Sequence, residues 1–189
     1  MGVLLIREIE ESYTLRLRFE GNGWYTPSTS VDVVVDASYI NRLMMAEDLV
    51  DSMRNEPDSN PALDTDLTDA DLYLVSAITN AQAGDIRASF DDVRLALTKL
   101  ENARDTGSGY DKFREPLTQL IVDLSKAVRD RTAVRITWAE DSGAYTQSQI
   151  DNAWDDYALG RRRLFERNYS DNLNGAIVKF KQAYSWVWP

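Results

Sequence analysis

The spacing of hydrophobic residues along the chain changes near residue 37. Before that point, residues 13–19 alternate between apolar and polar types, which is the period of a half-buried β-strand. Residues 31–36 alternate in the same way, after a glycine-rich turn signal at residues 21–23. Residues 3–9 are apolar enough for a third strand. The pattern therefore predicts a small N-terminal antiparallel β piece.

From residue 37 onward the apolar residues recur at intervals of three and four, which is typical of helices that bury one face. The first helix is expected over residues 37–54, with Ser38 as its N-cap. Residues 55–67 follow with two prolines and several turn-forming residues. We interpret this stretch as a linker and a domain boundary.

Beyond the linker the helical pattern continues almost to the end of the chain. Thr68 and Asp71 have the spacing of a capping box, and Gly84 and Gly143 lie between periodic stretches. The predicted helices cover residues 68–83, 86–104, 110–138, 146–167 and 173–186. Two of these pairs have the short connections of helical hairpins, which would pack around the long helix that begins at Tyr110.

The fold class that these patterns predict is mainly α, an antiparallel helical bundle of about five helices with the β piece in front of it. Its predicted domains are residues 1–54, holding the β piece and a connecting helix, the linker 55–67, and the bundle 68–189.

The amino-acid composition excludes several classes of function. The chain of 189 residues carries 31 acidic and 21 basic side chains, a net charge of -10, which disfavours binding to nucleic acid. It has no Cys and no His, so thiol nucleophiles, thiolate metal sites and the commonest general base are excluded. No apolar stretch is long enough for a transmembrane helix. We therefore expect a protein that is not an enzyme.

Part of the N-terminal region resembles a known family, and this resemblance suggests where the protein is located. Residues 13–36, from Tyr13 through the turn at Gly21 and the segment Pro27-Ser28 to Val35, resemble the end of an immunoglobulin-like repeat of prokaryotic surface proteins. The helical part loosely resembles the modules that follow such repeats in secreted proteins. An immunoglobulin-like domain has about seven strands, and this chain matches only the last of them. The resemblance implies an extracellular or cell-envelope location and an adhesive or structural role.

Acidic residues in and after the predicted linker are the one candidate metal site. Asp64, Asp66 and Asp69 offer hard oxygen ligands of the kind that calcium prefers. Their spacing departs from the EF-hand loop, because Asp69 stands where that loop needs glycine. The alternative is a solvated loop whose acids favour the start of the next helix. No other cofactor is expected.

Two features near the C-terminus are candidates for binding a partner. Aromatic residues are dense there, and most of them are expected to be core residues. Trp186 and Trp188 are the candidates for contacting a partner, and Trp188 is the harder one to place in a core. Arg161 and Arg162 belong to the one basic cluster, which either binds an acidic partner or forms a solvated helix face. The neighbouring acids Asp91 and Asp92 point in different directions on a helix, so they are a poor catalytic pair.

The sequence thus predicts a non-enzymatic structural or interaction module, the C-terminal part of a prokaryotic surface or secreted protein. A protein partner or self-association is expected. The alternative is an intracellular, cytoplasmic adaptor or assembly subunit whose strands complete a partner's sheet.

Overall fold

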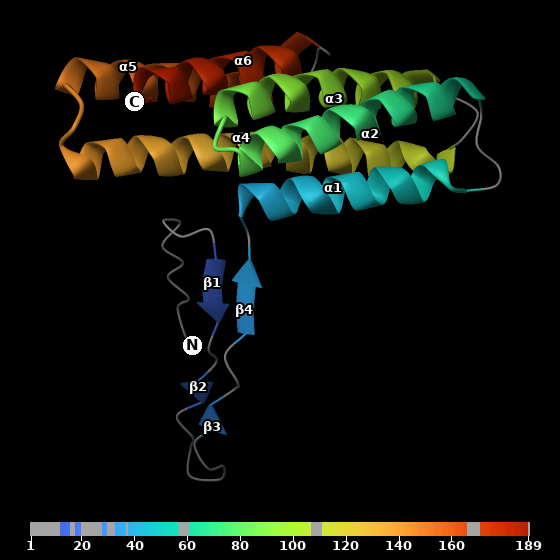
Figure 1. Ribbon diagram of the computed structural model, residues 1–189, viewed down its shortest axis with the longest axis horizontal. Helices are drawn as coiled ribbons and strands as arrows, with labels where there is room; N and C mark the ends of the chain where they lie inside the picture. Colours follow the sequence, from blue (N-terminus) through green and yellow to red (C-terminus); the bar gives the residue numbers. More distant parts are fainter. Residues whose placement is uncertain are drawn as a thin grey trace.

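The computed structural model describes residues 12–15, 18–19, 28–29, 33–36, 38–56, 61–106, 111–165 and 171–188. The chain is mainly helical, as predicted, and the described part contains six helices (Figure 1). Their bounds are α1 Tyr39–Arg54, α2 Pro61–Gln82, α3 Ile86–Thr106, α4 Asp111–Ser142, α5 Gln147–Phe165 and α6 Asp171–Trp186.

Among the described residues, four short strands precede the helices. Strand β1 (Ser12–Leu15) pairs antiparallel with β4 (Val33–Asp36), and β2 (Arg18–Phe19) pairs antiparallel with β3 (Ser28–Thr29). The strand predicted over residues 3–9 lies outside the described residues. Figure 1 shows β4 leading directly into α1, whose N-cap is Ser38, as predicted: its hydroxyl oxygen accepts a hydrogen bond from the Asn41 amide at 3.2 Å.

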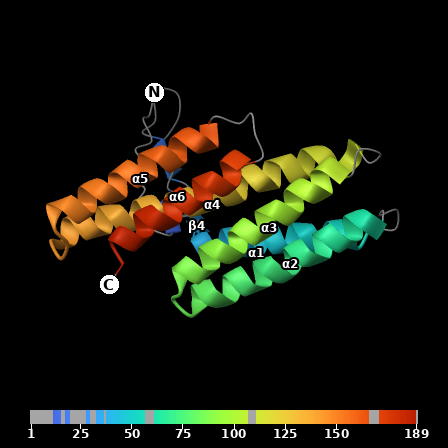
Figure 2. The ribbon, with the colours of Figure 1, turned by 90° about the horizontal axis from the view of Figure 1, so that it is seen from above.

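The helices form two hairpins and a long central helix, as expected. Helix α2 packs against α3, α5 packs against α6, and α4 contacts α1, α3, α5 and α6 (Figure 2). Helix α1 lies along α2 and α4, and its buried residues Leu43 and Val50 belong to the main core. It is therefore part of the bundle, whereas the sequence grouped it with the β piece.

The predicted linker is too long at its C-terminal side. Helix α2 begins at Pro61, and Thr68, the expected capping residue, lies inside it. Proline is tolerated in the first turn of a helix because its missing N–H has no partner there in any case. Leu63, Leu67 and Leu74 already follow the helical period and are fully buried. Because turn-forming residues surround these leucines in the sequence, their helical spacing was not recognised as the start of a helix.

A row of aromatic rings joins three helices through the core. The ring of Tyr39 in α1 meets Phe90 in α3 edge-to-face at 5.6 Å, and Phe90 meets Tyr184 in α6 edge-to-face at 5.4 Å. The Tyr39 hydroxyl is buried and lies 2.9 Å from the hydroxyl of Ser89, so both polar groups are satisfied. Burial raises the pKa of Tyr39 above its ordinary range, because the phenolate would be desolvated.

Helices α5 and α6 approach closely at Gly160. A Cβ atom added to this glycine would lie 2.7 Å from the Phe180 ring. Gly84, in the other hairpin, has a different structural role. Gly84 occupies the α2–α3 turn with a positive φ of 85°, whereas Gly160 is buried within α5.

A second, smaller core cluster, which includes Ile136, Ile150 and Val187, lies at the C-terminal end of α4. Arg135 links the segments beside this cluster. The Arg135 Nε donates to the carbonyl of Val187 at 2.8 Å, and its Nη2 donates to the Tyr145 hydroxyl at 2.6 Å. The same guanidinium lies over the ring of Trp138, 4.2 Å from its centroid. Arg135 therefore fixes the C-terminal end of α6 and the α4–α5 connection to the long helix.

The substitution Gly160→Ala is expected to lower the free energy of unfolding by about 1–2 kcal/mol, because the added methyl group overpacks a fully buried ring. Gly175→Ala is the matched control, since the methyl group there meets only the movable side chain of Arg163. In a helix, alanine alone is favoured over glycine by about 1 kcal/mol, so the control is expected to be neutral or stabilised. Urea denaturation measures both; equal stability of the two variants would contradict the packing argument.

The substitution Tyr39→Phe is expected to cost about 1–2 kcal/mol at neutral pH, because the Ser89 hydroxyl loses its buried partner. Tyrosine in the unfolded chain loses its proton near pH 10, while the folded Tyr39 retains it. The stability of the parent protein therefore falls as pH rises above 10, by up to about 1.4 kcal/mol per pH unit from this group. The variant lacks this loss, so the gap between the two should narrow above pH 10. A gap that stays constant in urea titrations across this range would refute the assignment.

Candidate functional site

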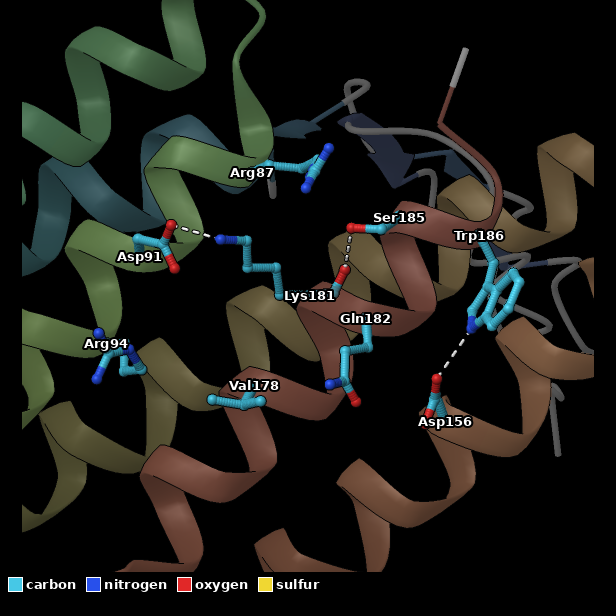
Figure 3. A pocket seen from close by; sticks show the side chains of 9 residues that line it. All are labelled: Arg87, Asp91, Arg94, Asp156, Val178, Lys181, Gln182, Ser185 and Trp186. Atoms are coloured by element: carbon cyan, nitrogen blue, oxygen red, sulfur yellow. Dashed lines mark hydrogen bonds and ion pairs between the residues drawn. The ribbon is translucent and has the colours of Figure 1, made fainter.

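The candidate site is a groove of about 770 Å³ between α3 and α6, with α5 at one side, called here the α3–α6 groove (Figure 3). Helix α3 contributes three charged residues, α6 contributes most of the other wall, and α5 contributes one acid. The lining residues are Arg87, Asp91, Arg94, Asp156, Val178, Lys181, Gln182, Ser185 and Trp186.

An ion pair crosses the middle of the groove. The Lys181 ammonium in α6 lies 2.5 Å from the Asp91 carboxylate in α3, and both side chains are partly exposed. Further along, the Thr98 hydroxyl lies 3.3 Å from the side-chain oxygen of Asn174. These two contacts tie the walls together at separate points, so the groove has fixed sides.

Two arginines of the groove are left without a protein partner. Arg87 and Arg94 lie on the same face of α3, on either side of Asp91 along the helix, as Figure 3 shows. Within the part of the chain that the structure describes, no hydrogen bond or ion pair engages either guanidinium. Their donors are therefore available to a ligand.

Trp186 forms the aromatic end of the groove and is 43% exposed. Its indole Nε1 donates to Asp156 at 3.0 Å, and the other oxygen of this carboxylate accepts from Lys179 at 2.8 Å. The hydrogen bond fixes the ring while leaving much of its surface open. The structure thus places Trp186, a partner-binding candidate from the sequence, at the groove.

Trp188, the second aromatic candidate, is half-buried. Its ring packs 5.4 Å from Tyr184, and it borders a smaller hollow of about 520 Å³ beside the α2–α3 turn. That hollow shares Arg87, Asp91 and Lys181 with the α3–α6 groove, so the two are neighbours.

The basic cluster of α5 lies apart from this groove. Arg161 and Arg162 are exposed, and neither lines the groove. The next residue, Arg163, donates to the carbonyl of Gly175 at 3.1 Å, across to α6. The structure does not bring the cluster together with Trp186.

The groove residues that sequence reasoning missed are Arg87, Arg94 and Lys181. A signal existed for the arginines, since they stand seven residues apart and therefore share one helix face. The acids Asp91 and Asp92 do point in different directions, as predicted. Asp91 faces Lys181, while Asp92 accepts hydrogen bonds from Ser76 and Asn80 of α2.

The acidic residues proposed for calcium lie on helix α2 instead of a loop. Asp66 and Asp69 flank one lysine, with oxygens 3.6 and 2.7 Å from the Lys99 ammonium. The hydrogen bond that the Lys99 ammonium donates to Asp69 raises the pKa of Lys99. Asp64 is partly buried near the start of the helix. Among the described residues, no group of three Asp or Glu side chains is arranged to hold a metal ion.

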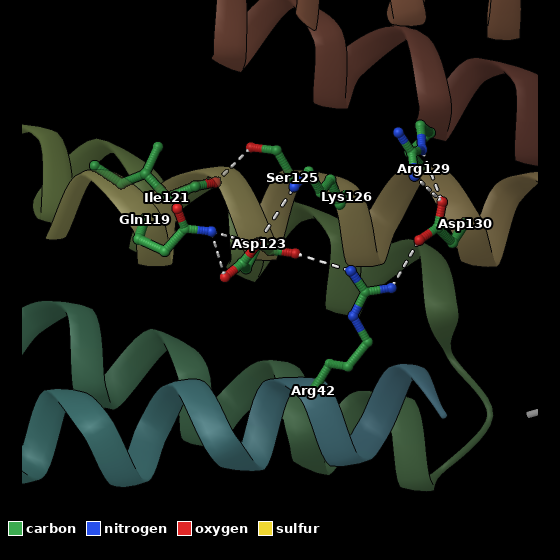
Figure 4. Close-up of polar contacts among 8 residues, drawn as sticks. All are labelled: Arg42, Gln119, Ile121, Asp123, Ser125, Lys126, Arg129 and Asp130. Carbon is green, nitrogen blue, oxygen red and sulfur yellow. Dashed lines mark hydrogen bonds and ion pairs between the residues drawn. The ribbon is translucent and has the colours of Figure 1, made fainter. Parts of the chain in front are cut away.

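A second, more apolar groove of about 440 Å³ lies between α1 and α4. Its polar groups are already used within the protein (Figure 4). Arg42 bridges the helices by donating to Asp130 at 2.8 Å and to the Asp123 carbonyl at 3.2 Å. Gln119 holds the Asp123 carboxylate. This groove therefore lacks the unpaired donors that distinguish the α3–α6 groove.

Comparisons with protein-family models, with curated proteins and with solved structures find no match to this chain. In the described part of the chain, no helix is both long and apolar enough to cross a membrane.

Proposed function

We propose that the chain is a non-enzymatic protein-interaction module that binds a partner segment in the α3–α6 groove. One observation carries this proposal: the groove combines a half-exposed tryptophan with two arginines that have no partner among the described residues, on walls that are held in place. Tryptophan and arginine are the residues most enriched at the energetic centres of protein interfaces.

The chemistry of the groove favours binding over catalysis. The chain has no His or Cys, and each of the two groove acids already has a partner. Asp91 pairs with Lys181, and Asp156 binds Trp186 and Lys179. A general base needs a carboxylate that is free to accept a proton from a substrate. These two carboxylates serve instead to position the groove walls.

A peptide selection tests where the binding surface lies, whatever the partner's chemistry. Random peptides displayed on phage are selected on the folded chain, and each binder is then titrated into the labelled protein in heteronuclear NMR. We expect binders that shift the indole N–H signal of Trp186, assigned by its loss in the Trp186→Phe variant.

Trp138 supplies the internal control for that titration. It is 50% exposed, lies on α4 and is stacked with Arg135, away from the α3–α6 groove. Binders that move the Trp138 signal and leave Trp186 unchanged would place the binding surface elsewhere. A selection that yields no binder at all would equally reject the proposal.

We further propose that the module belongs to a prokaryotic surface or secreted protein, where it would have a structural or adhesive role. The support is the pattern of residues 13–36, which resembles the end of an immunoglobulin-like surface repeat. The alternative is an intracellular adaptor. In that case the strands of residues 13–36 would pair with the edge of a partner's sheet.

Protease treatment of intact source cells separates these two locations. An antibody against the helical part is used to follow the native protein. We expect the signal to be lost from intact cells exposed to protease, or to be found in the medium. A signal that stays protected and fractionates with the cytosol would support the adaptor.

A further inference from the structure

We propose that the partner segment is an acidic amphipathic helix with two carboxylates seven residues apart, which bind Arg87 and Arg94. This inference rests on the proposed function, because it names the chemistry of the ligand in the same α3–α6 groove. It comes from the spacing, the free charges and the apolar surface of the groove.

The spacing of the arginines matches a helix. Arg87 and Arg94 are separated by two turns of α3, so their backbones are about 10.5 Å apart along the axis. Two residues seven apart on a partner helix have the same separation and the same face. A helix lying along α3 therefore presents both carboxylates to both guanidiniums at once.

Several basic side chains of the helices pair with acids, whereas Arg87 and Arg94, like Arg114 and Arg161, have no such partner among the described residues. Arg54 pairs with Asp71, Lys99 with Asp69, and Lys179 with Asp156. The chain carries ten more acidic than basic side chains, so acids to neutralise Arg87 and Arg94 are abundant. The fold instead directs both groups into the groove, where a carboxylate binds guanidinium with two parallel hydrogen bonds.

The α6 wall of the groove offers apolar surface to one face of a helix. The Lys181–Asp91 ion pair, which crosses the groove, has no net charge. On α6, Val178 is 40% exposed, and Trp186, on the side toward α5, is 43% exposed. Apolar residues three or four positions after the first carboxylate of the partner would lie over this surface.

The charge of the whole protein does not prevent an acidic partner. Three cations and two acids line the groove, so its net charge is +1 on a chain of net charge -10. At physiological salt, exposed charges beyond about 8 Å are largely screened. The two guanidiniums in contact with the partner therefore outweigh the distant acids.

The experiment uses the full chain and a synthetic helical peptide labelled with fluorescein. The peptide has glutamates at positions i and i+7, leucines at i+3 and i+4, and alanine or glutamine elsewhere. Fluorescence anisotropy measures its affinity. A peptide of the same composition with the glutamates at i and i+5, on different faces, is the matched ligand control and should bind about tenfold more weakly.

Variants of the protein test which arginines are used. Arg87→Gln and Arg94→Gln should each weaken binding about threefold to tenfold, and each loss should shrink when the matching glutamate is replaced by glutamine. Arg161→Gln removes the same charge from the exposed face of α5 and should leave the affinity unchanged. Because neither groove arginine has a partner among the described residues, the variants should melt at the parent temperature.

A double variant in which both arginines become acidic provides the most stringent test. The double variant Arg87→Glu, Arg94→Glu should lose the acidic peptide and gain a peptide with lysines at i and i+7. Equal binding of both glutamate spacings, or an equal loss in Arg161→Gln, would show attraction to net charge alone and overturn the inference. Sedimentation that reveals a dimer closed by this groove would do so as well, with a second copy as the occupant.

The two peptide experiments can show whether the inference fails while the proposed function still holds. If selected peptides shift Trp186 but carry no paired acids, the groove binds a partner and the acidic helix is wrong. If no peptide of either kind affects Trp186, the groove itself is rejected.

Discussion

The edge-to-face row of Tyr39, Phe90 and Tyr184 is the contact on which the rest of the arrangement depends. It brings α1, α3 and α6 to one point in the core, and these helices are far apart in the sequence. Because Phe90 and Tyr184 point inward, the next residues of their helices turn toward the groove. Asp91 follows Phe90 directly, and Ser185 follows Tyr184. The core therefore determines which side chains line the α3–α6 groove.

The distribution of charge follows from the same packing. Acidic side chains outnumber basic ones in the whole chain, and several ion pairs join one helix to another. Lys99 of α3 holds two acids of α2, and Arg42 of α1 reaches across to α4. Exposed pairs of this kind contribute little to stability individually. Their larger effect is to neutralise cations within the protein, whereas Arg87 and Arg94 of the groove have no such partner among the described residues.

Most of the helical fold is predictable from the period of apolar residues, and the exceptions have physical causes. Pro61 begins a helix although proline and its polar neighbours indicate a loop, because tertiary burial of the following leucines outweighs local propensity. The partner of Gly160 was not predictable, since spacing alone does not show that this glycine of α5 faces the Phe180 ring. The groove was harder to predict: Lys181 and Asp91 are 90 residues apart, and no local pattern connects them. Trp186 was a candidate because aromatic residues are dense in this part of the sequence, which is a local signal.

Arg135 gives the groove one further property. By holding the carbonyl of Val187, it anchors the last turn of α6, and Trp186 is the preceding residue. The walls are thus ordered before any partner arrives, so the conformational entropy lost on association falls mainly on the incoming segment. A helical partner would then be recognised by its readiness to fold as much as by its contacts. Residues of that partner that never touch the groove would tune its affinity through helix propensity alone.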